Sequence, residues 1–372
     1  MTCNITENKT APDPARHVAA RFDIPSYRYL DSDGRALAPL PAFAGDYDHI
    51  RKLYRMMLLV RSFDQRAIAL QRTGQLGTYA SCLGQEAIGT ALGDAMAAED
   101  VLLPSYRETP ALLMRGVAMH ELLLYWGGDE RGMAYGKVPH DFPICIPIAT
   151  QAPHAVGVAS AFKLRGEQRV AVSVFGDGAS SKGDFYEALN LAGIWRLPVL
   201  FIIVNNQWAI SVPRDAQSGA ETLAQKAIAG GLGCEQVDGN DLIAMRERIA
   251  SALAHARAGE PWLIEAKTYR LCDHTTADDA SRYRDKVELE RHRALEPVVR
   301  IRRYLEQAGQ WDQRQEDELK TSNDTEVENA VNTYLAAPPP SAQAMFDHLY
   351  AVLPESLHWQ LVQATEQGHG CG

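Results

Sequence analysis

Residues 170–211 read VAVSVFGDGASSKGDFYEALNLAGIWRLPVLFIIVNNQWAIS and carry the strongest fold signal in the chain. An apolar run from Val170 to Phe175 stops at a Gly-Asp-Gly turn, and a second run from Pro198 to Val204 stops at two asparagines. Between the runs, apolar residues recur at helical spacing, at Phe185, Ala188, Leu189, Ala192 and Trp195. We therefore predict a strand, a helix and a second strand that lies parallel to the first.

Polar residues follow both predicted strands, and open α/β sheets bind ligands at the carboxyl ends of their strands. Asp177 offers a carboxylate and Asn206 a carboxamide, which are hard oxygen donors suited to Mg²⁺. Gly176 and Gly178 permit a sharp turn and a close approach of the backbone to a ligand. These residues predict a site for a metal-bound phosphate ligand. A dinucleotide-binding interpretation is weaker, because Ser181 occupies the third glycine position of G-x-G-x-x-G.

Composition narrows the class of protein. Apolar residues make up 46% of the chain, as in ordinary globular proteins, and the net charge of −10 argues against nucleic acid as a partner. No apolar run is long enough for a membrane span, and the polar N-terminus lacks a signal-peptide core. The cysteines form no CxxC pair, so we expect free thiols, no structural zinc and a cytoplasmic location; they are Cys3, Cys82, Cys145, Cys234, Cys272 and Cys371.

The chain divides into three predicted parts: an N-terminal arm over residues 1–45, an α/β domain over 46–337 and a C-terminal segment over 338–372. A long loop is expected over 127–147, rich in Gly and Pro. The alternation of strands and helices predicts an α/β fold with a largely parallel sheet flanked by helices. Further helices are expected near 46–73, 84–96, 110–115, 119–126, 153–164, 242–253, 294–307 and 311–336, and further strands at 101–103 and 262–266.

Several motifs in a fixed order make the chain resemble the alpha subunit of the thiamine-diphosphate-dependent decarboxylase component of 2-oxo acid dehydrogenase complexes. The 26 residues between Gly178 and Asn205 resemble the GDG…NN motif of thiamine-diphosphate enzymes. The likeness spans about residues 50–355. It includes GTYASCLGQEA at 77–87, YRE at 106–108, PIATQAPHAVG at 147–157, NQWAIS at 206–211, VDGND at 237–241 and the YR…HTTADD…SRYR pattern at 269–284.

The resemblance implies a thiamine-diphosphate-binding fold with thiamine diphosphate and Mg²⁺ as cofactors. Asp177, Asn206 and the Trp208 carbonyl match the family's Mg²⁺ ligands, and Gly176 and Gly178 belong to the same cofactor-binding motif. Tyr106 and Arg107 match the pair at the diphosphate, where a guanidinium fork suits a phosphate. Ile148 matches an apolar residue that helps hold the bent cofactor.

His274 matches the family's active-site histidine, which lies on a mobile loop and also contacts the cofactor. Because residues 271–283 are polar and charged, we expect this loop to order only over a ligand. Three roles stay open for His274: it binds a phosphate oxygen, orients the substrate, or moves a proton during acyl transfer. Some family members also bind K⁺, and this possible site corresponds to Pro147, Thr150, Gln151 and the Cys145 carbonyl. The Thr-Gln pair before Pro153 also fits a helix-capping turn.

The implied function is oxidative decarboxylation of a small 2-oxo acid, with acyl transfer to a lipoyl group. Thr78, where many members have an aromatic residue, and the segment 104–110 favour pyruvate over the alternatives, which are branched-chain 2-oxo acids and acetoin. A noncatalytic regulatory subunit that keeps the fold is the alternative from a different class. The glutamate that activates the cofactor comes from a beta subunit in heteromeric members. We therefore expect a beta subunit, an α2β2 heterotetramer and a lipoyl-bearing acyltransferase as partners.

Overall fold

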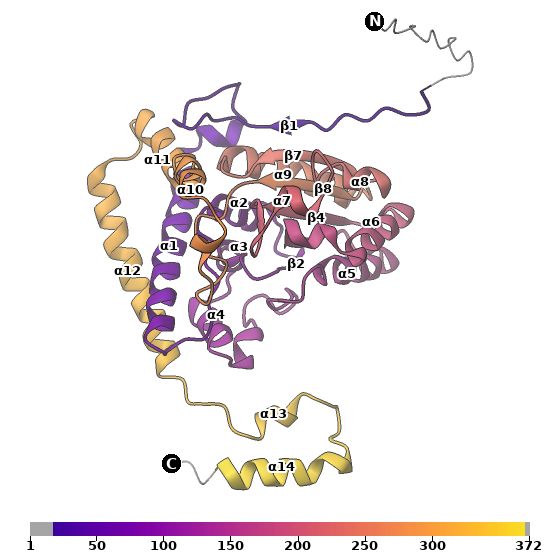
Figure 1. Ribbon diagram of the computed structural model, residues 1–372, viewed down its shortest axis with the longest axis vertical. Helices are drawn as coiled ribbons and strands as arrows, with labels where there is room; N and C mark the ends of the chain where they lie inside the picture. The colour runs from indigo at the N-terminus through magenta and orange to yellow at the C-terminus, as the bar shows by residue number, and fades with distance from the viewer. Residues whose placement is uncertain (1–17, 369–372) are drawn as a thin grey trace, which may run out of the picture.

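The computed structural model describes residues 18–368, so Cys3 and Cys371 lie outside the described residues. Its centre is a six-stranded sheet in which all neighbouring strands are parallel (Figure 1). The order is β1-β7-β8-β4-β3-β2, with β1 Ser26–Tyr27, β7 Gly233–Asp238, β8 Trp262–Lys267, β4 Val199–Asn205, β3 Ala171–Gly176 and β2 Val101–Leu103. The predicted α/β class with a parallel sheet is confirmed.

The strand–helix–strand unit predicted from residues 170–211 is present. Strand β3 leads through a short 3₁₀ helix, η3 (Asp177–Ser181), into α6 (Gly183–Trp195), which returns the chain to β4. The two strands pair in parallel, with Gly176 opposite Val204. The segments that follow β3 and β4 therefore leave the sheet side by side at one edge.

Both faces of the sheet are apolar, because every strand residue of β4 is buried and successive side chains point to opposite faces. Leu200, Ile202 and Val204 pack into a core shared with α1, α2 and α9. Val199, Phe201 and Ile203 pack into a second core with α5 and α6 on the other face. Helices covering two faces leave only the strand ends open for a ligand.

The helices follow the predicted pattern, with shifted boundaries. The longest, α1, begins after Asp46, whose side chain accepts a hydrogen bond from the His49 amide at 3.1 Å, and α12 lies beside it (Figure 1). The α-helices besides α6 are α1 Tyr47–Arg72, α2 Glu86–Ala95, α3 Thr109–Arg115, α4 Met119–Trp126, α5 Gln151–Arg165, α7 Arg214–Gln217, α8 Lys226–Ala229, α9 Leu242–Arg257, α10 Lys286–Arg293, α11 Pro297–Gln307, α12 Gln313–Leu335, α13 Ala344–Asp347 and α14 Glu355–Gly368.

Several elements were not predicted, among them β7, β1 and α10. Strand β7 carries Glu235, a residue that is poor in strands, yet the side chain is buried because Arg248 of α9 pairs with it at 2.7 Å. Strand β1 is only two residues long and comes from the segment expected to be an arm. Helix α10 has no buried residue that would give it an apolar face. Strands β7 and β1 are stabilised by pairing with residues far away in the sequence, which local sequence patterns do not show.

The remaining regular elements are short. Strands β5 (Trp208–Ala209) and β6 (Val212–Pro213) pair antiparallel just after β4, and 3₁₀ helices lie at η1 Ala42–Gly45, η2 Glu130–Met133 and η4 Ala280–Arg282. Helices α13 and α14 lie apart from the sheet and its flanking helices (Figure 1). Within residues 18–368, no helix is both long and apolar enough to span a membrane.

Candidate active site

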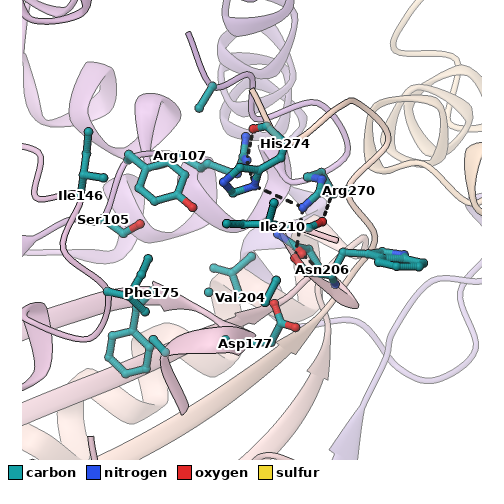
Figure 2. Close-up of a pocket in the computed structure, with 18 of the residues that line it drawn as sticks. Ser105, Arg107, Ile146, Phe175, Asp177, Val204, Asn206, Ile210, Arg270 and His274 are labelled. Carbon is teal, nitrogen blue, oxygen red and sulfur yellow. Dashed lines mark hydrogen bonds between the residues drawn. The ribbon is translucent and has the colours of Figure 1, made fainter. Parts of the chain in front are cut away.

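A cavity of about 920 Å³ opens at the carboxyl ends of β3 and β4. Figure 2 shows Asp177 on one side of this cavity, and Arg107, Arg270 and His274 on the other. The residues that line it include every site residue predicted from the sequence: Tyr106, Arg107, Ile148, Gly176, Asp177, Gly178, Asn206, Trp208 and His274. Segments from residues 106 to 274 thus meet at one concave surface.

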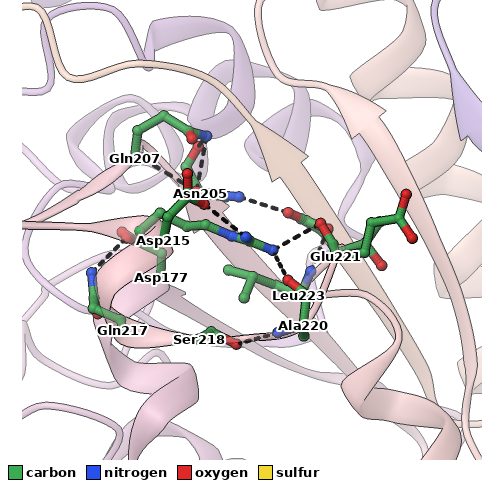
Figure 3. Close-up of polar contacts among 12 residues, drawn as sticks. Asp177, Asn205, Gln207, Asp215, Gln217, Ser218, Ala220, Glu221 and Leu223 are labelled. Carbon is green, nitrogen blue, oxygen red and sulfur yellow. Dashed lines mark hydrogen bonds and ion pairs between the residues drawn. The ribbon is translucent and has the colours of Figure 1, made fainter. Parts of the chain in front are cut away.

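The wall next to the sheet is built by the ends of β3 and β4. Asp177 and Asn206 are both almost fully buried. The Asn206 side chain accepts a hydrogen bond from the Trp208 amide at 3.2 Å and donates one to Gln85 Oε1 at 3.3 Å. Asp177 Oδ2 accepts from Gln217 Nε2 at 3.3 Å (Figure 3). These carboxylate and amide oxygens face the cavity from two neighbouring strand ends.

Asp177 is an isolated buried carboxylate. Burial raises its pKa to about 6, and hydrogen bonds from its own amide and from Gln217 only partly oppose that effect. Within residues 18–368, no group of three or more His, Cys, Asp or Glu side chains is placed to hold a metal ion. A cation in this cavity would therefore rely on Asp177 together with amide and carbonyl oxygens.

The opposite wall carries two guanidinium groups and an imidazole. Arg107 donates to the Ser81 carbonyl at 2.5 Å, to the carbonyl of His274 and to its Nδ1 at 3.2 Å. Arg270 also approaches His274 Nδ1, at 3.4 Å. In the described structure neither arginine forms an ion pair with a carboxylate, and both are almost fully buried. Two buried cations without acidic partners make this wall suited to an anion.

His274 is neutral at pH 7 in this environment. Burial is the main cause that lowers its pKa to about 4, and the positive charges of Arg107 and Arg270 lower it further. Its backbone amide donates to Asp278 Oδ2 at 2.8 Å, and its ring packs edge-on to Tyr106. Because Nδ1 accepts from the two arginines, the neutral ring carries its proton on Nε2, which can donate a hydrogen bond to a bound ligand.

The backbone beside the cavity is strained. Among the described residues, four non-glycine residues have positive φ, and three of them flank the site: Ala149 (69°), Gln207 (72°) and Ile210 (55°). Arg270 donates to the carbonyls of Trp208 at 3.1 Å and of Ile210 at 2.8 Å. These bonds hold the turn after β4 in a conformation that L-residues rarely adopt. They also fix the position of the Trp208 carbonyl beside the cavity.

The predicted glycine roles are only partly met. Gly176 and Gly178 both lie outside the positive-φ region, so the sharp turn after β3 is a 3₁₀ turn rather than a left-handed one. Gly178 is required for space, because a Cβ there would lie 2.7 Å from Ala209 Cβ. A Cβ at Gly176 would meet no protein atom within 4 Å. Ile148 is 44% exposed on the cavity wall and is not a core residue.

The loop that carries His274 is more firmly packed than its composition suggests. Leu271 is buried against Trp208 and Tyr269, and Arg284 donates to the carbonyls of Arg270 at 2.6 Å and Cys272 at 3.1 Å. The loop is thus held at its two ends, while most of its side chains between Leu271 and Ala280 stay partly or fully exposed.

The residues matched to a K⁺ site also adjoin the cavity. The Gln151 amide group donates to the Cys145 carbonyl, and among residues 18–368 its buried Oε1 finds no hydrogen-bond partner. Thr150 precedes α5, but its side chain makes no capping hydrogen bond. The helix-capping alternative therefore does not account for this pair in the structure.

The cavity residues that received no role from the sequence include the polar side chains Gln85, Glu108, Gln217 and Arg270. Glu108 is fully buried, and burial raises its pKa to about 7. Tyr-Arg pairs could not have indicated Arg270, because they occur at 27–28, 54–55, 106–107, 269–270 and 283–284 and only the pairs at 106–107 and 269–270 contribute residues to the cavity lining. Gln217 lies on a distant short helix and carries no signal either.

With this geometry in place, comparison with known proteins defines the family. Residues 54–343 match the family model described as "Dehydrogenase E1 component", and the chain belongs to this family of 2-oxo acid dehydrogenase oxidoreductases. It is 40% identical over 316 residues to the 3-methyl-2-oxobutanoate dehydrogenase subunit alpha of Mycobacterium tuberculosis (strain ATCC 25618 / H37Rv), an alignment that covers 84% of this chain and 86% of the relative.

Two other relatives are named for pyruvate in place of 3-methyl-2-oxobutanoate. The pyruvate dehydrogenase E1 component subunit alpha of Bacillus subtilis (strain 168) is 38% identical over 356 residues, covering 94% of this chain and 95% of the relative. The protein of the same name from Staphylococcus aureus (strain COL) is 38% identical over 312 residues, covering 83% and 84%. The identities, 40% and 38%, are too similar to separate the two substrates.

Proposed function

We propose that this chain is the alpha subunit of a pyruvate dehydrogenase that uses thiamine diphosphate and Mg²⁺. One observation carries the proposal: a single cavity has an isolated buried carboxylate on one wall and two buried guanidinium groups without acidic partners on the other. A diphosphate bound to a divalent cation complements both walls at once, because the cation meets Asp177 and the phosphate oxygens meet the arginines.

The residues at the strand ends fit a magnesium site. Asp177, the Asn206 side-chain oxygen and the Trp208 carbonyl are the hard oxygen donors that would hold the ion. The weak bond from Gln217, at 3.3 Å, leaves Asp177 available to a metal, and a bound cation would stabilise its charged form. Gly176 and Gly178 let the cofactor approach the backbone between these ligands.

On the other wall, Arg107 and Tyr106 would bind the diphosphate, and Ile148 would pack against the cofactor from its exposed position. When bound, thiamine diphosphate supplies the electron sink that decarboxylation of a 2-oxo acid requires. The protein's part is to orient cofactor and substrate and to exclude water. His274, neutral and directed at the cavity, would donate a hydrogen bond from Nε2 to the substrate or the cofactor.

A potassium ion next to Ile148 is part of the same proposal. The unpartnered Gln151 Oε1 and the nearby Cys145 carbonyl are oxygen donors that fit a monovalent cation. The pairing of the Gln151 amide with that carbonyl would have to change on ion binding, so a K⁺ dependence of stability is the expected sign of the site.

The active site requires a partner. The carboxylates that line the cavity are Asp177 and Glu108, and the first is assigned to the metal. We propose that a beta subunit supplies the carboxylate that activates the cofactor, that the assembly is an α2β2 heterotetramer, and that a lipoyl-bearing acyltransferase receives the acyl group. The free thiols of Cys82, Cys145, Cys234 and Cys272 suit a reducing compartment, which supports a cytoplasmic location.

The test is reconstitution with a beta subunit encoded beside the gene for this chain. We expect no 2-oxo acid decarboxylation by the isolated chain, and thiamine- and Mg²⁺-dependent turnover by the complex. A kcat/KM higher for pyruvate than for 3-methyl-2-oxobutanoate supports the pyruvate assignment; the reverse order assigns a branched-chain substrate. Turnover by the isolated chain would contradict the shared site.

A further inference from the structure

One short segment, residues 79–82, joins the two loops that carry the cationic wall. The Ser81 carbonyl accepts hydrogen bonds from Arg107, at 2.5 Å, and from Cys272 Sγ, at 3.6 Å. The Tyr79 amide donates to Thr276 Oγ1 at 3.0 Å, and the Tyr79 carbonyl accepts from the Thr276 amide at 2.9 Å. The position of this segment therefore sets both the Arg107 guanidinium and the loop around His274.

Asp64 of α1 holds residues 79–82 in place through hydrogen bonds. Its carboxylate accepts hydrogen bonds from the Tyr79 hydroxyl, from Ser81 Oγ at 2.5 Å and from the Cys82 amide at 2.9 Å. The side chain is 4% exposed, and in the described structure it forms no ion pair with Lys, Arg or His. Burial raises its pKa to about 6, while the bonds from Ser81 and Tyr79 favour the charged form.

We propose that Asp64 is a positioning residue for the cofactor: by fixing residues 79–82, it holds the Ser81 carbonyl where it orients the Arg107 guanidinium. Asp64 does not line the cavity, so it acts through Arg107 and not by contact with a ligand. The inference rests on the proposed binding of thiamine diphosphate to this site.

Replacement by asparagine is the informative change. The side chain introduced by Asp64→Asn has nearly the same volume, but one of its two terminal groups donates hydrogen bonds, so it cannot accept all three bonds that the carboxylate accepts. The donors around position 64 must then rearrange, and the segment moves with them. A small displacement of a group that orients a ligand contact is sufficient to weaken binding while the fold persists.

The experiment measures the dissociation constant of thiamine diphosphate, with Mg²⁺, by calorimetry on the reconstituted complex with the beta subunit. We expect Asp64→Asn to weaken binding about tenfold, which corresponds to about 1.4 kcal/mol. In an Arg107→Ala background, the same replacement should add less than about a twofold loss, because its route to the cofactor is already removed. This non-additivity separates positioning from general destabilisation.

Asp100→Asn is the control for the loss of a buried carboxylate away from the site. Asp100 accepts bonds from the Ala97 and Val170 amides at 3.0 and 2.9 Å and, unlike Asp64, also pairs with Arg257 at 2.9 Å; it precedes β2 and does not line the cavity. We expect it to lower the melting temperature without changing cofactor affinity in either background. Ser81→Ala provides a milder second variant, because it removes one bond to Asp64 and keeps the Ser81 carbonyl.

The outcomes are distinguishable. Wild-type complex that binds no thiamine diphosphate would overturn the proposed function and this inference with it. If the wild-type complex binds thiamine diphosphate, two results would overturn this inference and leave the proposed function intact. One is an unchanged affinity in Asp64→Asn, and the other is an equal loss of affinity in the presence and absence of Arg107. If Asp64→Asn does not assemble, Ser81→Ala decides: a several-fold loss that disappears in the Arg107→Ala background supports positioning, and an unchanged affinity refutes it.

Discussion

The two walls of the cavity are built by different means. The wall of Asp177 and Asn206 lies at the ends of two paired strands, and the register of Gly176 opposite Val204 fixes their separation. The wall of Arg107, Arg270 and His274 is formed by loops that are held together by bonds to backbone carbonyls. The first wall depends on the sheet, and the second depends on loop contacts that a ligand can modify.

The walls also differ in charge. The strand wall carries a carboxylate that burial disfavours in its charged form, whereas the loop wall carries two buried cations and a neutral imidazole. Neither wall is electrostatically satisfied alone, and a ligand with a cation at one end and phosphate oxygens near it satisfies both. The predictions below are ordered by their expected effect on the affinity for thiamine diphosphate, and each separates one wall from the other.

The largest effect is expected for Asp177→Asn, which should weaken binding of thiamine diphosphate with Mg²⁺ roughly 1,000-fold, or about 4 kcal/mol, because a buried cation loses its carboxylate partner. Calorimetry on the reconstituted complex measures this. Near-native affinity would rule out the metal assignment.

The same replacement should stabilise the ligand-free protein. The pKa of Asp177 is about 6 in the folded state against an ordinary value of 3.8, so the folded state keeps its proton between these pH values. The charged, buried carboxylate lowers the free energy of unfolding. This loss of stability is absent below pH 3.8, grows as the pH rises through 6 and is complete at pH 7. Asp177→Asn removes it, and we expect a gain of about 1–3 kcal/mol in the free energy of unfolding at pH 7, measured by denaturant titration without Mg²⁺. At about pH 4 the gain should vanish.

The loop wall should respond more weakly. We expect Arg107→Ala to reduce cofactor affinity roughly 100-fold, since a charge-assisted contact to phosphate is lost while the metal ligands remain. Mn²⁺ binding, measured by electron paramagnetic resonance in the presence of the cofactor, should still report coordination at Asp177. Loss of affinity equal to that of Asp177→Asn would mean that the two walls do not act separately.

The contrast between the walls also explains what the sequence could predict. Apolar runs that end in Gly-Asp-Gly and Asn-Asn encode strands whose ends must adjoin, so the positions of Asp177 and Asn206 followed from pattern and parallel pairing. On the loop wall, the roles of Arg107 and His274 were predicted only from the family resemblance. Arg270 received no role, because its partners are the carbonyls of Trp208 and Ile210, and backbone acceptors leave no trace in a sequence.

The polar composition around the His274 loop concealed two buried arginines that flank it, for a related reason. Arginine and aspartate side chains read as solvent-exposed, but Arg270 and Arg284 are buried because they donate to loop carbonyls and the Tyr283 hydroxyl. Strand β7 illustrates the same limit. A charged residue such as Glu235 argues against a buried strand, and its burial is explained only by the ion pair with Arg248, which the sequence does not reveal. Local patterns report apolar burial well, and they do not report burial that depends on distant hydrogen bonds.

His274→Asn should change cofactor affinity by less than about threefold, because Arg107 and Asp177 remain, while turnover falls because the Nε2–H donor at the substrate is lost. The replacement should also change acid stability. The folded pKa of about 4 lies below the ordinary value of 6.5, so the unfolded state takes up a proton first and stability falls as pH drops from 6.5 to 4. Denaturant titrations should show a smaller loss across this window in the variant; an identical loss would contradict the neutral state.

The last prediction leaves the affinity unchanged and concerns the response of the loop to the ligand. Arg282 is its exposed trypsin site, whereas Arg270 and Arg284 are buried. We expect thiamine diphosphate with Mg²⁺ to slow cleavage at Arg282 several-fold in the assembled complex, because ligand contacts stabilise the closed loop. Cleavage at Arg165, an exposed residue at the end of α5, provides the internal control. Equal rates at Arg282 with and without cofactor would show that the loop does not respond to the ligand.

The central claim is that one ligand joins the two walls through a metal at Asp177. The most direct measurement is an experimental structure of the complex with the beta subunit, thiamine diphosphate and Mg²⁺. The account predicts a metal ion about 2.0–2.1 Å from oxygens of Asp177, Asn206 and the Trp208 carbonyl, with the diphosphate between it and Arg107. A diphosphate bound elsewhere, or a metal that does not touch Asp177, would contradict it.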